Sequence, residues 1–364
     1  MRRIAAEFDD MRAAHLWAVS NDDAERALAL SAALHGYAHR TLRPEVFAWA
    51  ERAARLAGAA GHRLVPLALG SAALGTCVRG DLSRGRRLAE EAVEAACGAP
   101  EGYLGYQALA AAALFSGDLA AVRTQGRRAL ELAEVYGDRY QAIVTRIDDL
   151  LAVAYDGRTA DALAEAEAVV ATARSGSCPS AIAWSQYALG EVLLDHDPSR
   201  SLALLDESHA VAASLGCTFL TGVAGTSATT LRARQGDPAE ALRRFPELID
   251  LWERAGNWTQ QWTMLRSLIT TFVRLGRDEP AAVLYGAMNA SPTAAPVFGA
   301  DAERLADVLR TIEERAGREQ LAAWVERGRR LGDDEVVAFA RSAARASSGD
   351  TPFPVRNESR EDQR

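Results

Sequence analysis

The sequence predicts an all-α protein built as a solenoid of helical hairpins, and the spacing of its glycines is the first reason. One series, from Gly58 to Gly256, recurs every 39 or 40 residues. A second series, from Gly80 to Gly276, runs between them, with His196 at one of its positions. Each follows a run of helical apolar spacing, where glycine ends a helix. A helix–turn–helix unit repeated at about 40 residues indicates a helical solenoid.

The residues after these turns are the second reason. An aspartate follows the turn in four units, where it can cap the next helix; these are Asp81, Asp118, Asp197 and Asp237. Pro198 and Pro238 then occupy the first helical position, which suits proline. The repeated unit is therefore helix, short turn, helix, short turn.

Residues 1–57 form a front section without a clean repeat register. Helices are expected over 4–19, about 22–40, and 44–57, with Asn21-Asp22-Asp23 capping the second and Pro44 opening the third. The ends of solenoids are often irregular. We therefore expect an N-terminal helical capping unit here.

Residues 58–290 form the regular array. The first helices of the pairs are predicted near 63–78, 102–115, 139–155, 179–194, 217–234 and 257–274. The second helices are predicted near 82–96, 119–135, 159–174, 198–214, 238–254 and 278–290. Each pair buries an apolar face against its neighbours, so one elongated domain is expected.

The segment 291–300, rich in Pro and Ala, interrupts the array. Three further helices are predicted near 301–315, 318–330 and 333–346, which makes 291–346 a C-terminal helical cap. The tail 347–364 holds charges, Gly, Pro and Ser with little to bury, and we expect it to be disordered.

Composition excludes several kinds of chemistry. The chain of 364 residues contains no lysine, so all 41 of its basic residues are arginine. A Walker A loop, a protein-kinase β3 strand and a Schiff-base enzyme all require lysine. The net charge of −8 disfavours direct nucleic-acid binding, which needs a basic surface.

The cellular setting follows from the termini and the cysteines. The N-terminus lacks the apolar segment of a signal peptide. The uncharged run from Ser208 to Leu231 is divided by Gly216 and is too polar to cross a membrane. The four cysteines, at 77, 97, 178 and 217, form no CxxC pair; the equivalent positions of Cys178 and Cys217 fit small buried residues or, alternatively, a disulfide or metal pair. A cytoplasmic protein without membrane contact is expected.

No motif in the sequence supports catalysis. A P-loop, a GxSxG elbow and an HExxH helix are all lacking. His35 and His39 stand at i, i+4, which can chelate a metal, but no third ligand is evident. Packing explains the two histidines better. We predict no catalytic residue, no metal and no cofactor.

The first helices predict a polar groove. Alignment by their glycines places Arg146, Ser185, Gly225 and Leu265 in one column. Ile147, Gln186, Thr226 and Arg266 form the next column, and Asp148, Tyr187, Ser227 and Ser267 the one after. Either this is a solvated face with local ion pairs, which Asp148-Asp149 would need, or it is a groove that binds a peptide or a small ligand.

Aromatic side chains extend the predicted groove. Trp258 and Trp262 stand at i, i+4 at the start of one first helix, with Gln261 between them. They either anchor a partner or belong to the core. The candidate groove residues are Arg146, Asp148, Gln186, Trp258, Gln261, Trp262 and Arg266.

Two levels of resemblance sharpen these expectations. Second helices such as Gly236-Asp237-Pro238-Ala239-Glu240-Ala241-Leu242 resemble the second half of a tetratricopeptide repeat, although the period exceeds the usual 34 residues. That resemblance implies a right-handed superhelix whose first helices line a concave groove.

Three stretches resemble the C-terminal repeat region of large bacterial LuxR-type and cyclase-linked regulators, which carry a STAND-class ATPase. The segment 7–18, EFDDMRAAHLWA, resembles the family's E-x-D-N-L-R-A-A-L-x-W-A, with Asp10 in place of asparagine and Met11 and His15 in place of leucine. The segments 281–287, AAVLYGA, and 324–331, WVERGRRL, resemble A-A-R-L-L-G-A and W-x-x-x-G-x-x-L. All three are packing motifs.

The resemblance implies a role in bacterial signal transduction or transcriptional regulation. The family's ATPase, winged-helix and DNA-binding or cyclase parts have no counterpart here, so the chain is either a stand-alone solenoid or an arm of a longer regulator. We expect a non-enzymatic protein-interaction module whose partner is a protein or peptide, such as a regulator or an ATPase. The alternative is a sensor that binds a peptide or small inducer in the concave groove. An enzyme that uses Asp148 is the third hypothesis.

Overall fold

The computed structural model describes residues 2–176 and 178–347, and within them the chain is helical and contains no strand. Helices pack against their neighbours in sequence order, as expected for a helical array. In the same residues, none of the helices is both long and apolar enough to cross a membrane. The predicted tail lies outside the described residues except for Ser347, which ends the last helix.

The N-terminal section consists of α1 (Arg2–Ala6), α2 (Phe8–Ser20), α3 (Ala24–Thr41) and α4 (Pro44–Ala54). A break at Glu7 divides the single helix expected over 4–19. The ring of Trp49 stacks between Phe8 and His15, with ring centroids 5.5 Å and 4.8 Å apart. These aromatic contacts fix α2 against α4.

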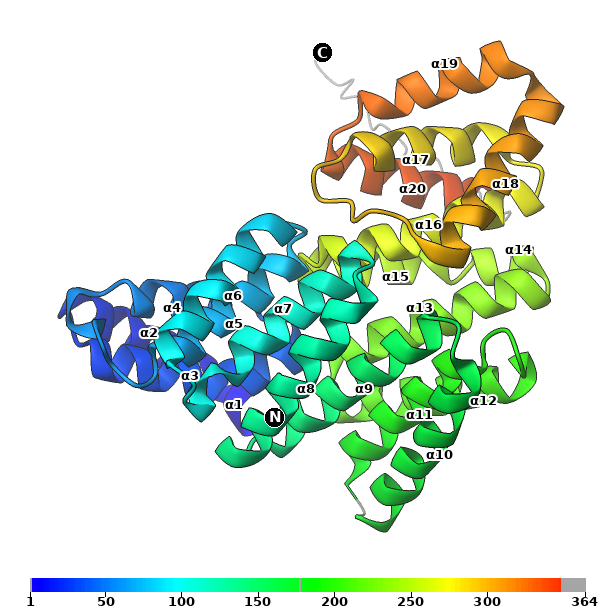
Figure 1. The fold of residues 1–364 in the computed structure, drawn as a ribbon. Coiled ribbons are helices and arrows are strands. Elements are labelled where there is room, and N and C mark those ends of the chain that lie inside the picture. The colour runs from blue at the N-terminus through cyan, green and yellow to red at the C-terminus, as the bar shows by residue number, and fades with distance from the viewer. Residues whose placement is uncertain (1, 177, 348–364) are drawn as a thin grey trace, which may run out of the picture.

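Helical hairpins follow, and they run from the left of Figure 1 through its centre to the lower right. They are α5 (Val65–Val78), α6 (Leu82–Ala96), α7 (Tyr103–Ser116), α8 (Leu119–Tyr136), α9 (Arg139–Tyr155), α10 (Thr159–Ser175), α11 (Pro179–Leu193), α12 (Pro198–Leu215) and α13 (Thr218–Gln235). Short 3₁₀ turns, Ala57–Ala59 and Pro100–Gly102, precede α5 and α7. The predicted bounds agree with these helices to within two residues.

The predicted N-caps are confirmed. The carboxylates of Asp81, Asp118 and Asp197 accept from the backbone N–H three residues later, and Asp237 accepts from Ala239. Each supplies a partner for one of the N–H groups that open a helix. These caps explain why the helix starts could be located from the sequence.

The helix expected over 238–254 is broken in two. It forms α14 (Pro238–Leu242) and α15 (Phe245–Ala255), separated at Arg243 and Arg244. Pro246 lies in the first turn of α15. Its ring clashes with the carbonyl four residues before and it has no N–H to donate, so the first helix must end there.

The array is curved, so that helices far apart in the sequence are in contact. α13 contacts α3, and α16 (Trp258–Arg274) contacts α5. The hydroxyl of Thr259 donates to the carbonyl of Cys77 at 2.6 Å, although the two residues are 182 positions apart. The inner side of the array is therefore largely filled by its own helices.

A segment at 291–298 holds this closed arrangement. It joins α17 (Asp278–Ala290) to α18 (Gly299–Ala316) and crosses the turns that follow α5 and α7. A Cβ on Gly80 would lie 2.7 Å from the Thr293 Cβ, so only glycine fits that turn. The hydroxyl of Thr293 accepts from the Trp262 indole at 2.8 Å and donates to Asp333 at 3.0 Å.

The last helices, α19 (Arg318–Arg329) and α20 (Asp333–Ser347), pack with α17 and α15 at the upper right of Figure 1. One hydrophobic cluster joins Leu42 to residues from Val144 to Ala344, and another extends from Ala18 to Ala133. The domain boundaries at 57/58 and 290/291 stay predictions.

Candidate functional site

A row of buried polar side chains fills the interior of the array. His35 on α3 lies 2.8 Å from the Ser71 hydroxyl and 2.9 Å from the amide nitrogen of Gln141. Gln107 in turn donates to Gln141 at 3.0 Å. Each of these side chains thus has a hydrogen-bond partner, which is the usual condition for burying polar groups, although the amide oxygen of Gln107 is buried without one among the described residues. His35 and His39 therefore serve packing, and no group of residues suited to hold a metal occurs in the described part of the chain.

Four side chains on α9 and α11 form a second polar group, which we call the acid–tyrosine cluster: Asp148, Tyr155, Tyr187 and Glu191. The Tyr155 hydroxyl donates to one carboxylate oxygen of Glu191 at 3.1 Å, while the other carboxylate oxygen is buried and has no hydrogen-bond partner within residues 2–176 and 178–347. The i, i+4 spacing of Tyr187 and Glu191 places both on one face of α11.

The acid–tyrosine cluster is packed by protein and still reaches solvent. Tyr155 exposes 46% of its surface, yet desolvation raises its pKa well above the ordinary 10. Its side chain is therefore accessible although protein surrounds its hydroxyl. Desolvation and the charge of Asp149 raise the pKa of Asp148 to about 7. Burial likewise raises the pKa of Glu191, although the hydroxyls of Ser227 and Tyr155 favour its charged form.

Asp148→Asn should stabilise the protein above neutral pH. The folded pKa of about 7 exceeds the ordinary 3.8, so the folded protein must give up a proton from a desolvated site as the pH rises through 7. We expect a gain of about 1–3 kcal/mol at pH 8 that disappears toward pH 4, measured by urea unfolding. Asp149→Asn should bring a smaller gain, because it removes only the repulsion on Asp148 and gives up the ion pair with Arg123, whose atoms lie 3.6 Å apart. Lower stability of Asp148→Asn at pH 8 would contradict the desolvated environment of Asp148.

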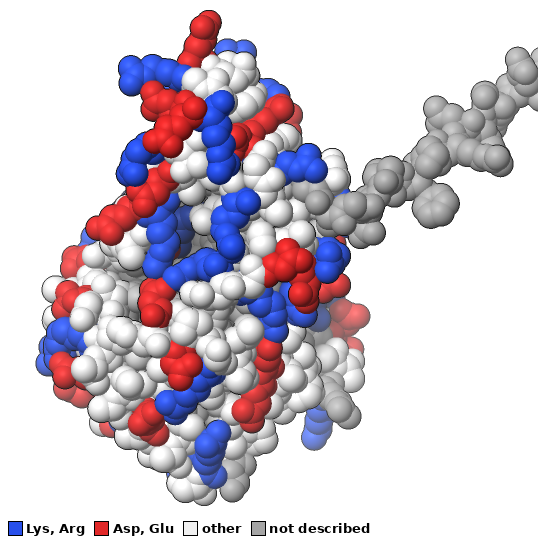
Figure 2. All heavy atoms as spheres, turned by 90° about the vertical axis from the view of Figure 1, so that its right-hand side faces the viewer, with Lys and Arg blue, Asp and Glu red and all other residues white. Residues whose placement is uncertain are grey.

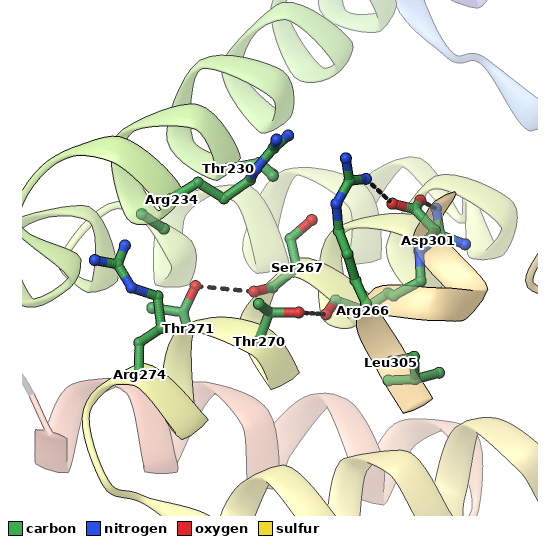
Figure 3. Close-up of a pocket in the computed structure, with 11 residues that line it drawn as sticks. Thr230, Arg234, Arg266, Ser267, Thr270, Thr271, Arg274, Asp301 and Leu305 are labelled. Atoms are coloured by element: carbon green, nitrogen blue, oxygen red, sulfur yellow. Dashed lines mark hydrogen bonds and ion pairs between the residues drawn. The ribbon is translucent and has the colours of Figure 1, made fainter. Parts of the chain in front are cut away.

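Next to this cluster lies a pocket with a volume of about 50 Å³, which we call the arginine pocket. Its walls come from α13, α16 and α18 (Figure 3). The lining residues are Thr230, Ala233, Arg234, Arg266, Ser267, Thr270, Thr271, Arg274, Asp301, Arg304 and Leu305. Arg266 and Asp301 are close enough to shift the pKa of Tyr155, so the pocket lies beside the acid–tyrosine cluster. We call the two groups of residues together the cleft.

Two aspartates bind three of the pocket's four arginines. Arg266 pairs with Asp301 at 2.9 Å, and Arg304 bridges Asp301 and Asp195 at 2.8 Å and 3.1 Å. Arg234 also pairs with Asp195, which lies in the turn after α11. Basic side chains gather around a hollow on the face that carries α18 (Figure 2). The pocket is thus positively charged.

The structure separates the predicted groove residues. Asp148 and Arg266 lie in the cleft, as do Tyr187, Ser227 and Ser267 of the Asp148 column. Arg146 instead points toward α8, where it lies 3.7 Å from Glu134 and lines a different hollow of about 280 Å³. The charges of that hollow balance, since Arg127 and Arg146 face Asp149 and Glu165.

The other predicted groove residues belong to the interior. Gln186 and Gln261 are almost fully buried, and their amide groups have no hydrogen-bond partner among the described residues. Trp262 is buried against the 291–298 segment, and the partly buried Trp258 lies beside it with ring centroids 6.5 Å apart. The first helices α13 and α16 contact α3 and α5 on the inner side of the array. The side chains of Gln186, Gln261 and Trp262 therefore do not line an open groove.

Sequence reasoning missed six residues of the cleft: Tyr155, Glu191, Arg234, Arg274, Asp301 and Arg304. A helical signal existed for four of them, and one is Arg274, which follows Ser267 by seven residues. Arg234 follows Ser227 by seven residues, Glu191 follows Tyr187 by four, and Tyr155 follows Asp148 by seven, which keeps each on the face already identified. Asp301 and Arg304 come from α18, whose approach no local pattern indicates.

Comparison with protein-family models found no matching family, and comparison with curated protein sequences found no matching protein.

Proposed function

We propose that this chain is a non-enzymatic binding module of the tetratricopeptide-like class, a right-handed superhelix with a repeat of about 40 residues. Sequential packing of its helices supports this proposal. The resemblance of segments 7–18, 281–287 and 324–331 to LuxR-type and STAND regulators supports a role in bacterial signal transduction or transcriptional regulation.

Within that role, we propose that the chain senses a small ligand or the end of a peptide, bound in the cleft. Contacts of α13 with α3 and of α16 with α5 leave little room for a long peptide along the inner side. The cleft between α9, α11, α13 and α18 offers aromatic faces, hydrogen-bonding groups and positive charge together.

The environment of Tyr155 carries this proposal. Its ring is accessible to a ligand, its hydroxyl is bound to Glu191, and it lies near the Arg266–Asp301 pair. Aromatic side chains held rigidly in a concave site are the usual anchors of binding energy. Helix α18 supplies one wall of the cleft and directly follows the 291–298 segment. A ligand that favours one position of α18 would therefore bias how the C-terminal helices dock.

Tyr155→Ala should lower ligand affinity by at least about tenfold. The full chain is purified from its own cells, and the bound compounds are identified by native mass spectrometry and extraction. Tyr136→Ala is the matched control, since Tyr136 is exposed to 40% and lies on α8 outside the cleft. We expect one compound with the wild type and with Tyr136→Ala, and its loss with Tyr155→Ala. A wild-type protein free of any compound, or equal retention by Tyr155→Ala, would refute the proposed function.

A further inference from the structure

Arg274 is the unpaired member of the arginine pocket. Its side chain lines the pocket and is exposed, and it forms no ion pair or hydrogen bond with any described residue. It follows Ser267 by seven residues and Thr270 by four, so the same face of α16 carries all three. A guanidinium group with free donors in a recess is available to a ligand.

The pocket has an excess of positive charge. Four arginines face only Asp195 and Asp301, which leaves two positive charges without a carboxylate. The two aspartates hold Arg234, Arg266 and Arg304 in place, and their carboxylates show how an oxyanion meets these guanidinium groups. A second, dianionic group would therefore complete the charge balance of the site.

Hydroxyl donors complete the lining. Thr230 on α13 and Ser267 on α16 both line the pocket, and neither hydroxyl has a hydrogen-bond partner among the described residues. Figure 3 shows Arg234 reaching across from α13 toward Arg266, with Ser267 between them. A cavity that holds a single water molecule has a volume of roughly 10–15 Å³. The volume of about 50 Å³ therefore admits a compact group of several atoms.

We propose that the arginine pocket binds a dianionic phosphate group carried by the ligand of the cleft. The inference rests on the proposed function and names the chemical class of that ligand. Bidentate guanidinium donors suit the oxygens of phosphate, and the two hydroxyls supply further donors. Tyr155 and Tyr187 would then contact the remainder of the ligand, next to the phosphate.

Inorganic phosphate is the probe. Binding to the full chain is measured by calorimetry at constant ionic strength, with succinate as a dianionic carboxylate for comparison. We expect phosphate to bind more tightly than succinate, and Arg274→Ala to weaken phosphate binding by at least about tenfold. Arg277→Ala is the matched control, because Arg277 is also exposed and without a partner among the described residues but lies outside the pocket.

The outcomes separate this inference from the proposed function. Tyr155→Ala should keep phosphate binding, because Tyr155 does not line the arginine pocket. Absent phosphate binding, equal binding by Arg274→Ala and wild type, or tighter binding of succinate would overturn the phosphate site. In each of these cases, a comparison of the compounds retained by the wild type and by Tyr155→Ala would still decide whether the cleft is a binding site.

Discussion

Lowering the pH from 7 to 5 should remove about 6 kcal/mol of folding free energy through three buried histidines. Burial lowers the pKa of His15 and of His35 from 6.5 to about 4, and that of His39 to about 3. The positive charge of Arg52 adds to the effect at His15, and His35 and Arg40 add to it at His39.

The direction of this change in stability follows from proton uptake. Below pH 6.5 the unfolded chain binds a proton at each histidine, whereas the folded chain stays neutral until about pH 4. Stability is therefore fully present above pH 6.5 and is lost as the pH falls toward 4. Each histidine contributes about 2 kcal/mol at pH 5, and the raised pKa of Asp148 returns about 2–3 kcal/mol over the same range.

The substitution His15→Leu measures the contribution of a single histidine to this dependence on pH. Both ring nitrogens of His15 are buried, with no hydrogen-bond partner in the part of the chain that the structure describes, and the resembling family segment has leucine there. Leucine should raise stability by about 1 kcal/mol at pH 7, because an unpaired buried polar group is lost. At pH 5 the gain should reach about 3 kcal/mol, because one titrating group is also lost. Urea unfolding between pH 4.5 and 8 measures both.

His196→Gln is the control, because the His196 side chain is exposed. We expect this variant to keep the wild-type dependence of stability on pH. If His15→Leu also kept the wild-type dependence, His15 would be protonated in the folded state and its buried environment would be wrong.

Gly286→Ala should destabilise the C-terminal helices by about 2–4 kcal/mol. The helices α17 and α19 cross in backbone contact. A Cβ on Gly286 would lie 2.1 Å from the Val325 carbonyl oxygen, and one on Gly328 would lie 2.0 Å from the Val283 carbonyl oxygen. Neither carbonyl can move without its helix, so the pair of helices must separate. Both glycines lie in the stretches that carry the family resemblance.

Gly126→Ala is the matched control for this crossing. Gly126 lies inside α8, and a Cβ there would meet no atom within 4 Å. Alanine at an unobstructed helical position should stabilise the protein by about 0.5–1 kcal/mol. Thermal unfolding of both variants should therefore give shifts of opposite sign. A melting temperature of Gly286→Ala at or above the wild-type value would contradict the close crossing.

Most of the fold could be predicted because local chemistry marks the ends of its helices. Asp118 and Asp197 cap as expected, and Gly117, Gly137 and Gly216 adopt the left-handed conformation that glycine tolerates best. The closure of the array could not be predicted. It depends on contacts such as Thr259 with Cys77 and Thr293 with Gly80, which join residues far apart in sequence and leave no local pattern.

The candidate site could be predicted only in part, for the same reason. Helical register placed Asp148, Tyr187, Ser227 and Ser267 in one column, since these belong to corresponding turns of successive first helices. Register could not show that closure buries Gln186 and Gln261, or that α18 brings Asp301 to Arg266.

Cross-linking from two tyrosine positions tests the central claim, that the cleft is the binding face. Benzoylphenylalanine is placed at Tyr155 or at Tyr136 in the full chain, in its own cells, and adducts are identified after irradiation. The two side chains expose 46% and 40% of their surfaces, so accessibility is matched. The account predicts a defined adduct at position 155 and none at position 136. An adduct at position 136 alone would place binding on the outer helices and contradict the account.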